Sequence, residues 1–363
     1  MNFYIITEPE FAKNYWNFKY MAGLRSAVRE YKGTLVALTA DELHALSDIN
    51  SEGTRTSLIL NGRSPDWITS LASLACDMGF HPILLASHNQ ALQRGVSSLR
   101  FDFYGLYSDW LSYLSKQGFH SIALVGVSKD NISDALKQQA FNDHKRRQGK
   151  ENNRSIYCIE SSLQECLDRF LRDREKYDAI LCTNDVIAIV LTGELRKRGL
   201  ENALPVHSFW DSPLSKYVSH GEKQISLDYN ELGRQAIKLY AFLNNNQNIE
   251  SISADVRVRL STDIEPQRSA SALSGKNIFM QDECAKDVYT LETLFSSMDE
   301  VDLQIISGIL AGDVYEAIAD RANVSLGTIK YRMKKMMTLA QKKKREELIS
   351  LITKYLNRSY IGG

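Results

Sequence analysis

Short apolar runs alternate with helical patterns through residues 1–268 of this 363-residue chain. Strands that alternate with helices predict parallel sheets, with crossover helices on both faces. About ten expected strands fit two doubly wound lobes, so we predict an α/β fold. The expected strands are Phe3–Thr7, Thr34–Thr39, Ser57–Leu60, Pro82–Ala86, Ser98–Phe101, Ser121–Gly126, Ser155–Ile159, Ala179–Thr183, Val206–Trp210 and Val256–Leu260.

Open sheets of this kind bind ligands at the carboxyl ends of their strands. Two lobes can present those ends to each other across a cleft, and hinge closure then traps the ligand. No GxGxxG or GxxxxGK[ST] motif follows any of the expected strands. The sequence therefore argues against a dinucleotide site or a phosphate-binding loop of those types.

Composition narrows the class of protein further. Hydrophobic residues make up 44% and charged residues 24%, which is ordinary for a soluble globular protein, and the formal net charge is zero. The five cysteines lack metal-ligand spacing, so we expect reduced thiols and a cytoplasmic location. We expect no membrane segment, metal or cofactor. No Ser or Cys pairs convincingly with His and Asp, so we do not expect an enzyme.

The stretch from Gly312 to Lys335 has the pattern of two short helices joined by a tight turn. Ser325 is a plausible N-cap of the second helix, which buries Ile329, Met333 and Met336. A second helix of this kind can enter the major groove of DNA as a helix-turn-helix. We assign to DNA contact the polar residues Ser325, Thr328, Lys330, Tyr331, Lys334 and Lys335.

Charge reverses sharply at this stretch. Residues 282–320 contain ten acidic residues and one basic residue, whereas residues 321–363 contain eleven basic and two acidic residues. A basic face at that point is what neutralisation of DNA phosphates requires. The alternative is a solvated, lysine-rich helical hairpin that contacts no nucleic acid.

The segment Ser296–Met336 resembles the C-terminal DNA-binding module of LuxR-type regulators. Gly312 falls where those modules carry a glycine, and Val324-Ser325 followed by Thr328-Ile329-Lys330 matches the turn and the start of the recognition helix. The chain departs from the pattern at Leu326-Gly327, where the family more often has polar residues. The resemblance implies a fourth helix over Lys342–Leu356 that often helps such modules to dimerise.

Residues 1–268 resemble the ligand-binding core of the LacI/GalR family, which is itself similar to periplasmic sugar-binding proteins. The matching motifs are Ala179-Ile-Leu-Cys-Thr-Asn-Asp-Val186, Pro205-Val-His-Ser-Phe-Trp-Asp-Ser-Pro213 and Leu227-Asp-Tyr-Asn-Glu-Leu-Gly-Arg234. Those repressors begin with their helix-turn-helix, whereas Phe3 here already lies in the first core strand. The DNA reader would therefore stand at the other end of the chain, as it does in xylose-responsive regulators.

Carried over residue by residue, the resemblance implies an effector site at Glu8, Phe11, Arg63, Asp102, Lys137, Asn184, Trp210 and Asp211. Lys137 stands where the family usually has a sugar-binding arginine, and Trp210 replaces the first aspartate of an aromatic-Asp-Asp motif. Each residue has a simpler alternative. Asn184 could cap the following helix, Trp210 could pack between lobes, and Lys137 could be solvated.

We therefore predict a two-lobed effector-binding domain at 1–268, a linker at 269–290 and a helix-turn-helix DNA-binding domain at 291–363. The expected protein is a ligand-responsive transcriptional regulator, a homodimer that binds double-stranded DNA and a sugar or sugar derivative. The alternative is a solute-binding or assembly protein that binds no DNA and uses its C-terminal helices to oligomerise.

Overall fold

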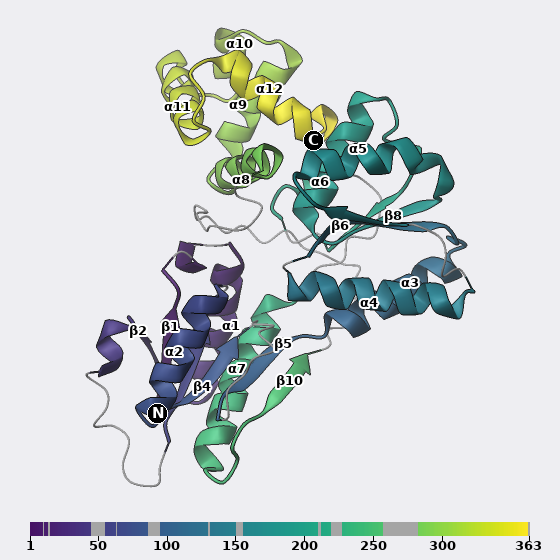
Figure 1. Ribbon diagram of the computed structural model, residues 1–363. Helices are drawn as coiled ribbons and strands as arrows, with labels where there is room; N and C mark the ends of the chain where they lie inside the picture. The colour runs from purple at the N-terminus through teal and green to yellow at the C-terminus, as the bar shows by residue number, and fades with distance from the viewer. Residues whose placement is uncertain are drawn as a thin grey trace. The chain divides into compact units, whose positions relative to one another are not determined.

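The computed structural model describes residues 1–9, 11–13, 15–44, 55–62, 64–85, 95–129, 131–149, 155–209, 212–218, 227–256 and 282–361. The chain divides into two compact units (Figure 1). Unit 1 contains Met1–Leu106 and Leu227–Arg259, and unit 2 contains Tyr107–Ser226 and Leu260–Gly363. Both units contain a parallel sheet, and helices follow at the C-terminal end, which confirms the predicted fold class.

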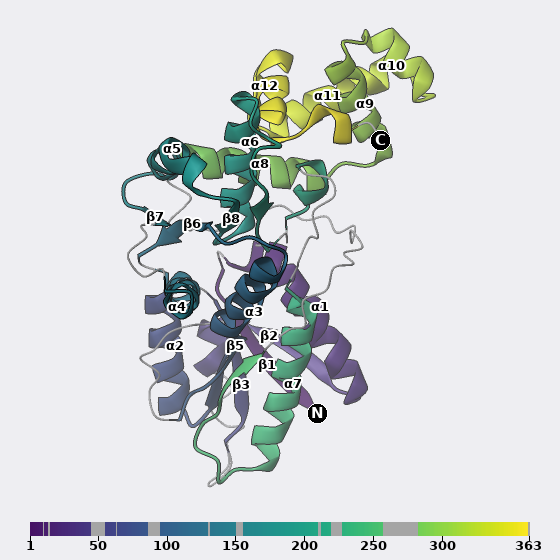
Figure 2. The same cartoon turned by 90° about the vertical axis from the view of Figure 1, so that its right-hand side faces the viewer.

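Unit 1 is built on a six-stranded parallel sheet of order β10-β5-β4-β3-β1-β2. Helices α1 (Tyr15–Glu30) and α7 (Tyr229–Asn245) pack together on one face, and α2 (Pro65–Asp77) covers the other (Figure 2). The last expected strand overlaps β10 only at Val256, and residues 257–260 lie outside the described residues. The strands are β1 (Asn2–Thr7), β2 (Thr34–Leu38), β3 (Ser57–Asn61), β4 (His81–Leu85), β5 (Ser97–Phe101) and β10 (Ser253–Val256).

Unit 2 contains a four-stranded parallel sheet of order β7-β6-β8-β9. Its strands are β6 (Ile122–Ser128), β7 (Ile156–Ile159), β8 (Ala179–Cys182) and β9 (Val206–His207). Helices cover both faces of this sheet (Figure 1). On one face lie α3 (Phe103–Lys116) and α4 (Ile132–Arg147), and on the other lie α5 (Leu163–Asp173) and α6 (Asp185–Lys197). The interior strands β6 and β8 are buried along their whole length, as expected of strands covered on both faces.

Five further helices complete unit 2: α8 (Glu283–Ser296), α9 (Glu300–Ala311), α10 (Tyr315–Arg321), α11 (Leu326–Leu339) and α12 (Arg345–Tyr355). Helix α8 contacts α5, α6, α11 and α12. The apolar side chains of the sheet, of α6 and of these C-terminal helices form one continuous buried cluster. Helix α8 begins at Glu283, inside the range 269–290 for which we expected a linker.

Close backbone contacts join the C-terminal helices to the rest of unit 2. A Cβ atom on Gly193 of α6 would lie 2.5 Å from the backbone oxygen of Lys354 in α12, so only glycine permits this approach. The Asn357 N–H donates to the Tyr217 carbonyl at 2.8 Å, and the Leu163 N–H at the start of α5 donates to the Asp282 carboxylate at 2.8 Å. The helices are therefore held by both apolar packing and hydrogen bonds.

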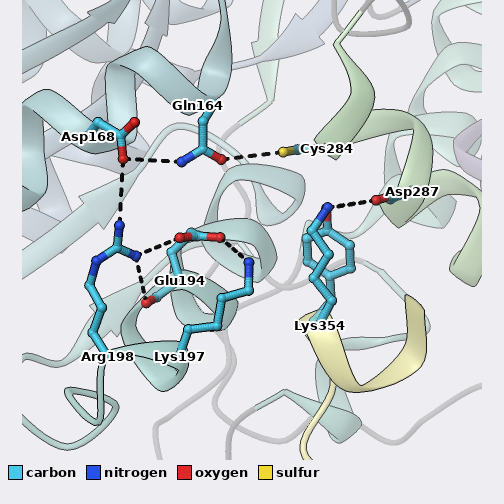
Figure 3. A network of polar contacts seen from close by, with 9 residues as sticks. Gln164, Asp168, Glu194, Lys197, Arg198, Cys284, Asp287 and Lys354 are labelled. Atoms are coloured by element: carbon cyan, nitrogen blue, oxygen red, sulfur yellow. Dashed lines mark hydrogen bonds and ion pairs between the residues drawn. The ribbon is translucent and has the colours of Figure 1, made fainter. Parts of the chain in front are cut away.

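Polar side chains extend this junction at its edge (Figure 3). The Cys284 thiol of α8 donates to Gln164 Oε1 of α5 at 3.7 Å, and Gln164 in turn donates to Asp168. Three residues further along α8, Asp287 accepts hydrogen bonds from Lys354 Nζ at 2.9 Å and from the Tyr355 hydroxyl at 3.1 Å. Helix α8 is thus bonded through side chains to both α5 and α12.

Candidate functional site

Helices α10 and α11 are two short helices joined by a tight turn, as the sequence pattern predicted. Gly312 ends α9 in the left-handed conformation (φ 87°), which reverses the chain before α10. Asn323 has a φ of 52° in the turn between α10 and α11. Ser325 caps α11, because its hydroxyl accepts the Thr328 N–H at 3.1 Å. The predicted cap and turn are therefore present.

The buried side of α11 consists of Ile329, Met333 and Met336, as the sequence pattern predicted. The opposite side is polar. Lys330, Tyr331, Lys334 and Lys335 are exposed, and the Tyr331 side chain is 71% exposed. Thr328 is half-buried and shares a 2.9 Å hydrogen bond with Ser325. The face that we assigned to DNA is thus open and carries three lysines around one tyrosine.

The orientation of α11 is set by an ion-pair cluster. Arg332 Nη1 lies 2.8 Å from Asp299 Oδ2 and 2.9 Å from Asp302 Oδ1, both at the start of α9. Asp299 also caps α9 with a reciprocal hydrogen bond to Asp302. Arg332, in the middle of α11, is therefore paired with acidic residues of α9, whereas the neighbouring lysines of α11 are exposed on the surface.

A second basic segment was not assigned from the sequence. Lys343, Lys344 and Arg345 are exposed in the connection from α11 to α12. The Glu347 carboxylate accepts the backbone N–H groups of Lys343 and Lys344, which fixes this connection. The run of four basic residues at 342–345 was the signal for this segment in the sequence.

In unit 2, Lys137 lies among buried groups rather than in solvent. Its side chain is 6% exposed, and Nζ donates to Asp134 Oδ1 at 2.9 Å and to the Thr183 carbonyl at 2.8 Å. Tyr107 donates to the carbonyl of Cys182 at 2.9 Å, and burial raises the pKa of this phenol well above its usual value. Lys137 therefore helps to anchor the end of β8, and the solvated alternative is excluded.

Asn184 follows β8 and caps α6, because its side-chain oxygen accepts the Ile187 N–H at 3.1 Å. The capping alternative is therefore correct for that oxygen, and a role of Asn184 towards a ligand would fall to its amide nitrogen. The neighbouring Asp185 is only 3% exposed. Trp210 and Asp211, the candidates after β9, lie outside the described residues.

In unit 1, three of the candidate effector residues are described. Glu8 follows β1, and its carboxylate accepts the Ser64 N–H at 3.2 Å. Phe11 is 6% exposed and packs near Tyr20, with ring centroids 6.4 Å apart. Asp102 follows β5 and accepts the Gly105 N–H at 2.8 Å, which caps the start of α3. Arg63 lies outside the described residues.

Helix α8 carries a buried polar group that was not predicted from the sequence. Glu292 is 4% exposed, and its carboxyl shares a hydrogen bond with the Ser212 side chain. Burial, and then the nearby Asp185, raises the pKa of Glu292 to about 8, so this carboxyl is neutral at pH 7. The available signal was an acidic residue among the apolar positions Leu291, Leu294 and Phe295 of one helical pattern.

Two general properties of the described residues bear on the class of protein. No group of three or more His, Cys, Asp and Glu side chains among them could hold a metal ion. None of their helices combines the length and apolar character needed to cross a bilayer.

Comparison with known proteins agrees with this geometry. Residues 111–262 match the family model described as a periplasmic binding protein-like domain. No curated protein sequence matches the chain. The match covers the sheet of unit 2 and returns through α7 and β10, so it ends before α8.

Solved structures show the same fold over most of the chain. A LacI family transcriptional regulator from Silicibacter pomeroyi is 16% identical, with a TM-score of 0.52 over 70% of this chain and 95% of that one. A complex of the transcriptional regulator CelR with cellobiose is 15% identical, with a TM-score of 0.54 over 72% of this chain and 83% of that one. A dimeric Lac repressor with an 11-residue C-terminal deletion is 16% identical, with a TM-score of 0.55 over 74% and 100%.

These similarities define the class by its fold. The chain combines a periplasmic-binding-protein-like α/β region with additional helices at its C-terminal end.

Proposed function

We propose that this chain is a ligand-responsive transcriptional regulator whose C-terminal helices bind double-stranded DNA. The observation that carries the proposal is the exposed face of α11, where Lys330, Tyr331, Lys334 and Lys335 surround a capped helix that follows a tight turn. Helices presented in this way enter the major groove. In this proposal the lysines neutralise phosphates, and Thr328 and Tyr331 contact base edges.

The α/β region supports the sensing part of the proposal. Ligands of parallel α/β sheets bind beyond the carboxyl ends of the strands, where Asn184, Trp210, Asp211 and Asp102 occur in this chain. One structure with the same fold is a regulator in complex with cellobiose. A tryptophan, an amide and a carboxylate suit a polar ring, so the proposed effector is a sugar or sugar derivative.

The packing of α12 weighs against the alternative of an assembly module. The apolar side of α12, formed by Leu348, Leu351, Ile352 and Tyr355, is buried, and the helix contacts α6, α8 and α11 of its own chain. That side is therefore occupied and is not available to pair with another protein. The exposed part of the helical region is instead basic along α11.

Salt dependence of DNA retention tests the DNA-binding part directly. The full-length protein should select a duplex from a random-sequence library, and its affinity should fall steeply with salt. Lys334→Ala with Lys335→Ala should reduce the slope of log K against log salt by about two, one for each lost phosphate contact. Lys286→Ala with Lys129→Ala, at two lysines outside the proposed reading helix, is the matched control and should leave the slope unchanged.

The effector is tested separately by a library of sugars and sugar derivatives. A compound that binds the folded protein raises its melting temperature by mass action.

The assignment of α11 as the DNA-reading helix would be refuted by either of two results. One is DNA binding with no salt dependence, and the other is a double lysine variant that keeps the wild-type slope.

A further inference from the structure

Three buried polar side chains meet where α8 packs on α6. Glu292 of α8 is 4% exposed, Asp185 of α6 is 3% exposed and Ser212 is 5% exposed. The Glu292 carboxyl shares a hydrogen bond with Ser212 and lies close enough to Asp185 for the two carboxyls to interact electrostatically. One side chain of a C-terminal helix thus joins two separate segments of the α/β region.

Both segments directly follow strands that are neighbours in the sheet. Asp185 comes immediately after Asn184, beyond β8, and Ser212 comes immediately after Asp211, beyond β9. Asn184 and Asp211 are the residues to which the proposed function assigns the effector. Glu292 therefore interacts electrostatically with Asp185 and by a hydrogen bond with Ser212, the next residue along the chain from each of these two candidates.

The same helix also contacts the proposed reader. Helix α8 packs against α11 and α12, and its buried side chains belong to the cluster that contains Ile329, Met333 and Met336 of α11. Packed interiors of this kind transmit small displacements, because their side chains have few alternative arrangements. A shift at Glu292 is consequently a shift of the support on which α11 rests.

We propose that Glu292 links the effector site to the DNA-reading helix. A ligand bound beyond β8 and β9 that repositions Asn184 changes the interactions of Asp185 and Ser212 with Glu292, and α8 carries that change to α11. The inference rests on the proposed function, since it describes how that site is regulated. Coupling between two binding sites is reciprocal, so DNA bound at α11 must also act on the segments beyond β8 and β9.

The hydrogen bonds that Glu292 can make in this link depend on its neutral state at pH 7. A protonated carboxyl can donate one hydrogen bond and accept others, whereas a carboxylate beside Asp185 would be repelled. Among the charged side chains in the described parts of α5, α6, α11 and α12, Asp185 is the one that acts on Glu292. Glutamine reproduces the neutral carboxyl, and leucine removes its hydrogen bonds while filling the volume.

The test uses the full-length protein, a duplex that it has selected from a random-sequence library, and amide hydrogen exchange at pH 7. In the wild type, DNA should slow exchange by about fivefold or more at residues 184–187 and 212–218. Glu292→Gln should keep this protection, and Glu292→Leu should lose it while still binding the duplex. Glu283→Leu, at an exposed position of the same helix, is the matched control and should behave as wild type.

A further variant keeps the test decisive if Glu292→Leu does not fold. Ser212→Ala breaks the same hydrogen bond from the other side and should lose the protection at residues 212–218. Protection that persists in these variants, or that is absent from a wild-type protein that binds the duplex, would overturn the link and leave the proposed function intact. Failure of the wild type to bind any duplex would refute the proposed function and the link together.

Discussion

Replacement of Glu292 by glutamine should change how the stability of the protein depends on pH. The pKa of this carboxyl is about 8 in the folded protein and close to the ordinary value of 4.5 in the unfolded chain. Between these values the folded state holds a proton that the unfolded state has released. The contribution of Glu292 to the free energy of unfolding is therefore fully present below about pH 4.5 and is lost progressively as the pH rises to about 8.

The magnitude follows from one proton. Each pH unit in this window should lower the free energy of unfolding of the wild type, relative to Glu292→Gln, by about 1.4 kcal/mol. Across the whole window the difference is on the order of 5 kcal/mol. Urea unfolding of both proteins at pH 6, 7, 8 and 9 measures it, with Glu283→Gln as the exposed control. Unfolding curves of wild type and Glu292→Gln that shift in parallel between pH 6 and 8 would refute the assignment of a neutral, buried Glu292.

Two further predictions concern the junction of the C-terminal helices with the rest of unit 2. Gly193→Ala should destabilise the protein by about 1–3 kcal/mol, because its Cβ would meet the Lys354 carbonyl oxygen 2.5 Å away. Gly327→Ala is the matched control in α11, where the nearest atom is Ser325 Oγ at 3.5 Å, and it should stabilise the protein by about 1 kcal/mol. A fragment of residues 1–268 should melt at a lower temperature than the full chain and bind a hydrophobic dye, because it loses the helices that cover α6. Equal melting temperatures for Gly193→Ala and wild type, or a fragment as stable as the full chain, would contradict this account of the junction.

The α/β architecture could be predicted because local pattern and tertiary environment agree. Runs such as Ile122–Val127 and Ala179–Cys182 are apolar throughout, which is the signature of strands covered on both faces, and both are buried strands in the structure. The buried side of α11 was predictable for the same reason, since Ile329, Met333 and Met336 recur at helical spacing. The cap at Ser325 could be predicted because it depends only on Ser325 and on the residues that follow it in the chain.

The packing of the C-terminal helices could not be read from the sequence in the same way. A Ser- and Ala-rich stretch and a charge reversal suggested a linker over 269–290, yet residues 283–290 belong to α8 and pack on α5 and α6. An amphipathic helix shows that it has a buried face but does not show which element covers that face. Lys137 illustrates the same gap, because its buried partners come from Asp134 and from the distant Thr183.

The junction also bears on how two readers would be arranged in a homodimer. The apolar side of α12 is buried within the chain, and the Lys354–Asp287 ion pair and the Asn357–Tyr217 hydrogen bond reinforce that packing. A homodimer of the intact chain would therefore pair through surfaces other than this side of α12. Since α11 packs on α8, and α8 packs on α5 and α6 of the same unit, the surfaces that pair two chains would also set the distance between their two reading helices. In the proposed dimeric regulator, that distance would decide which half-site spacing is accepted, so a ligand-driven change within the α/β region would alter DNA affinity without altering any residue proposed to contact DNA.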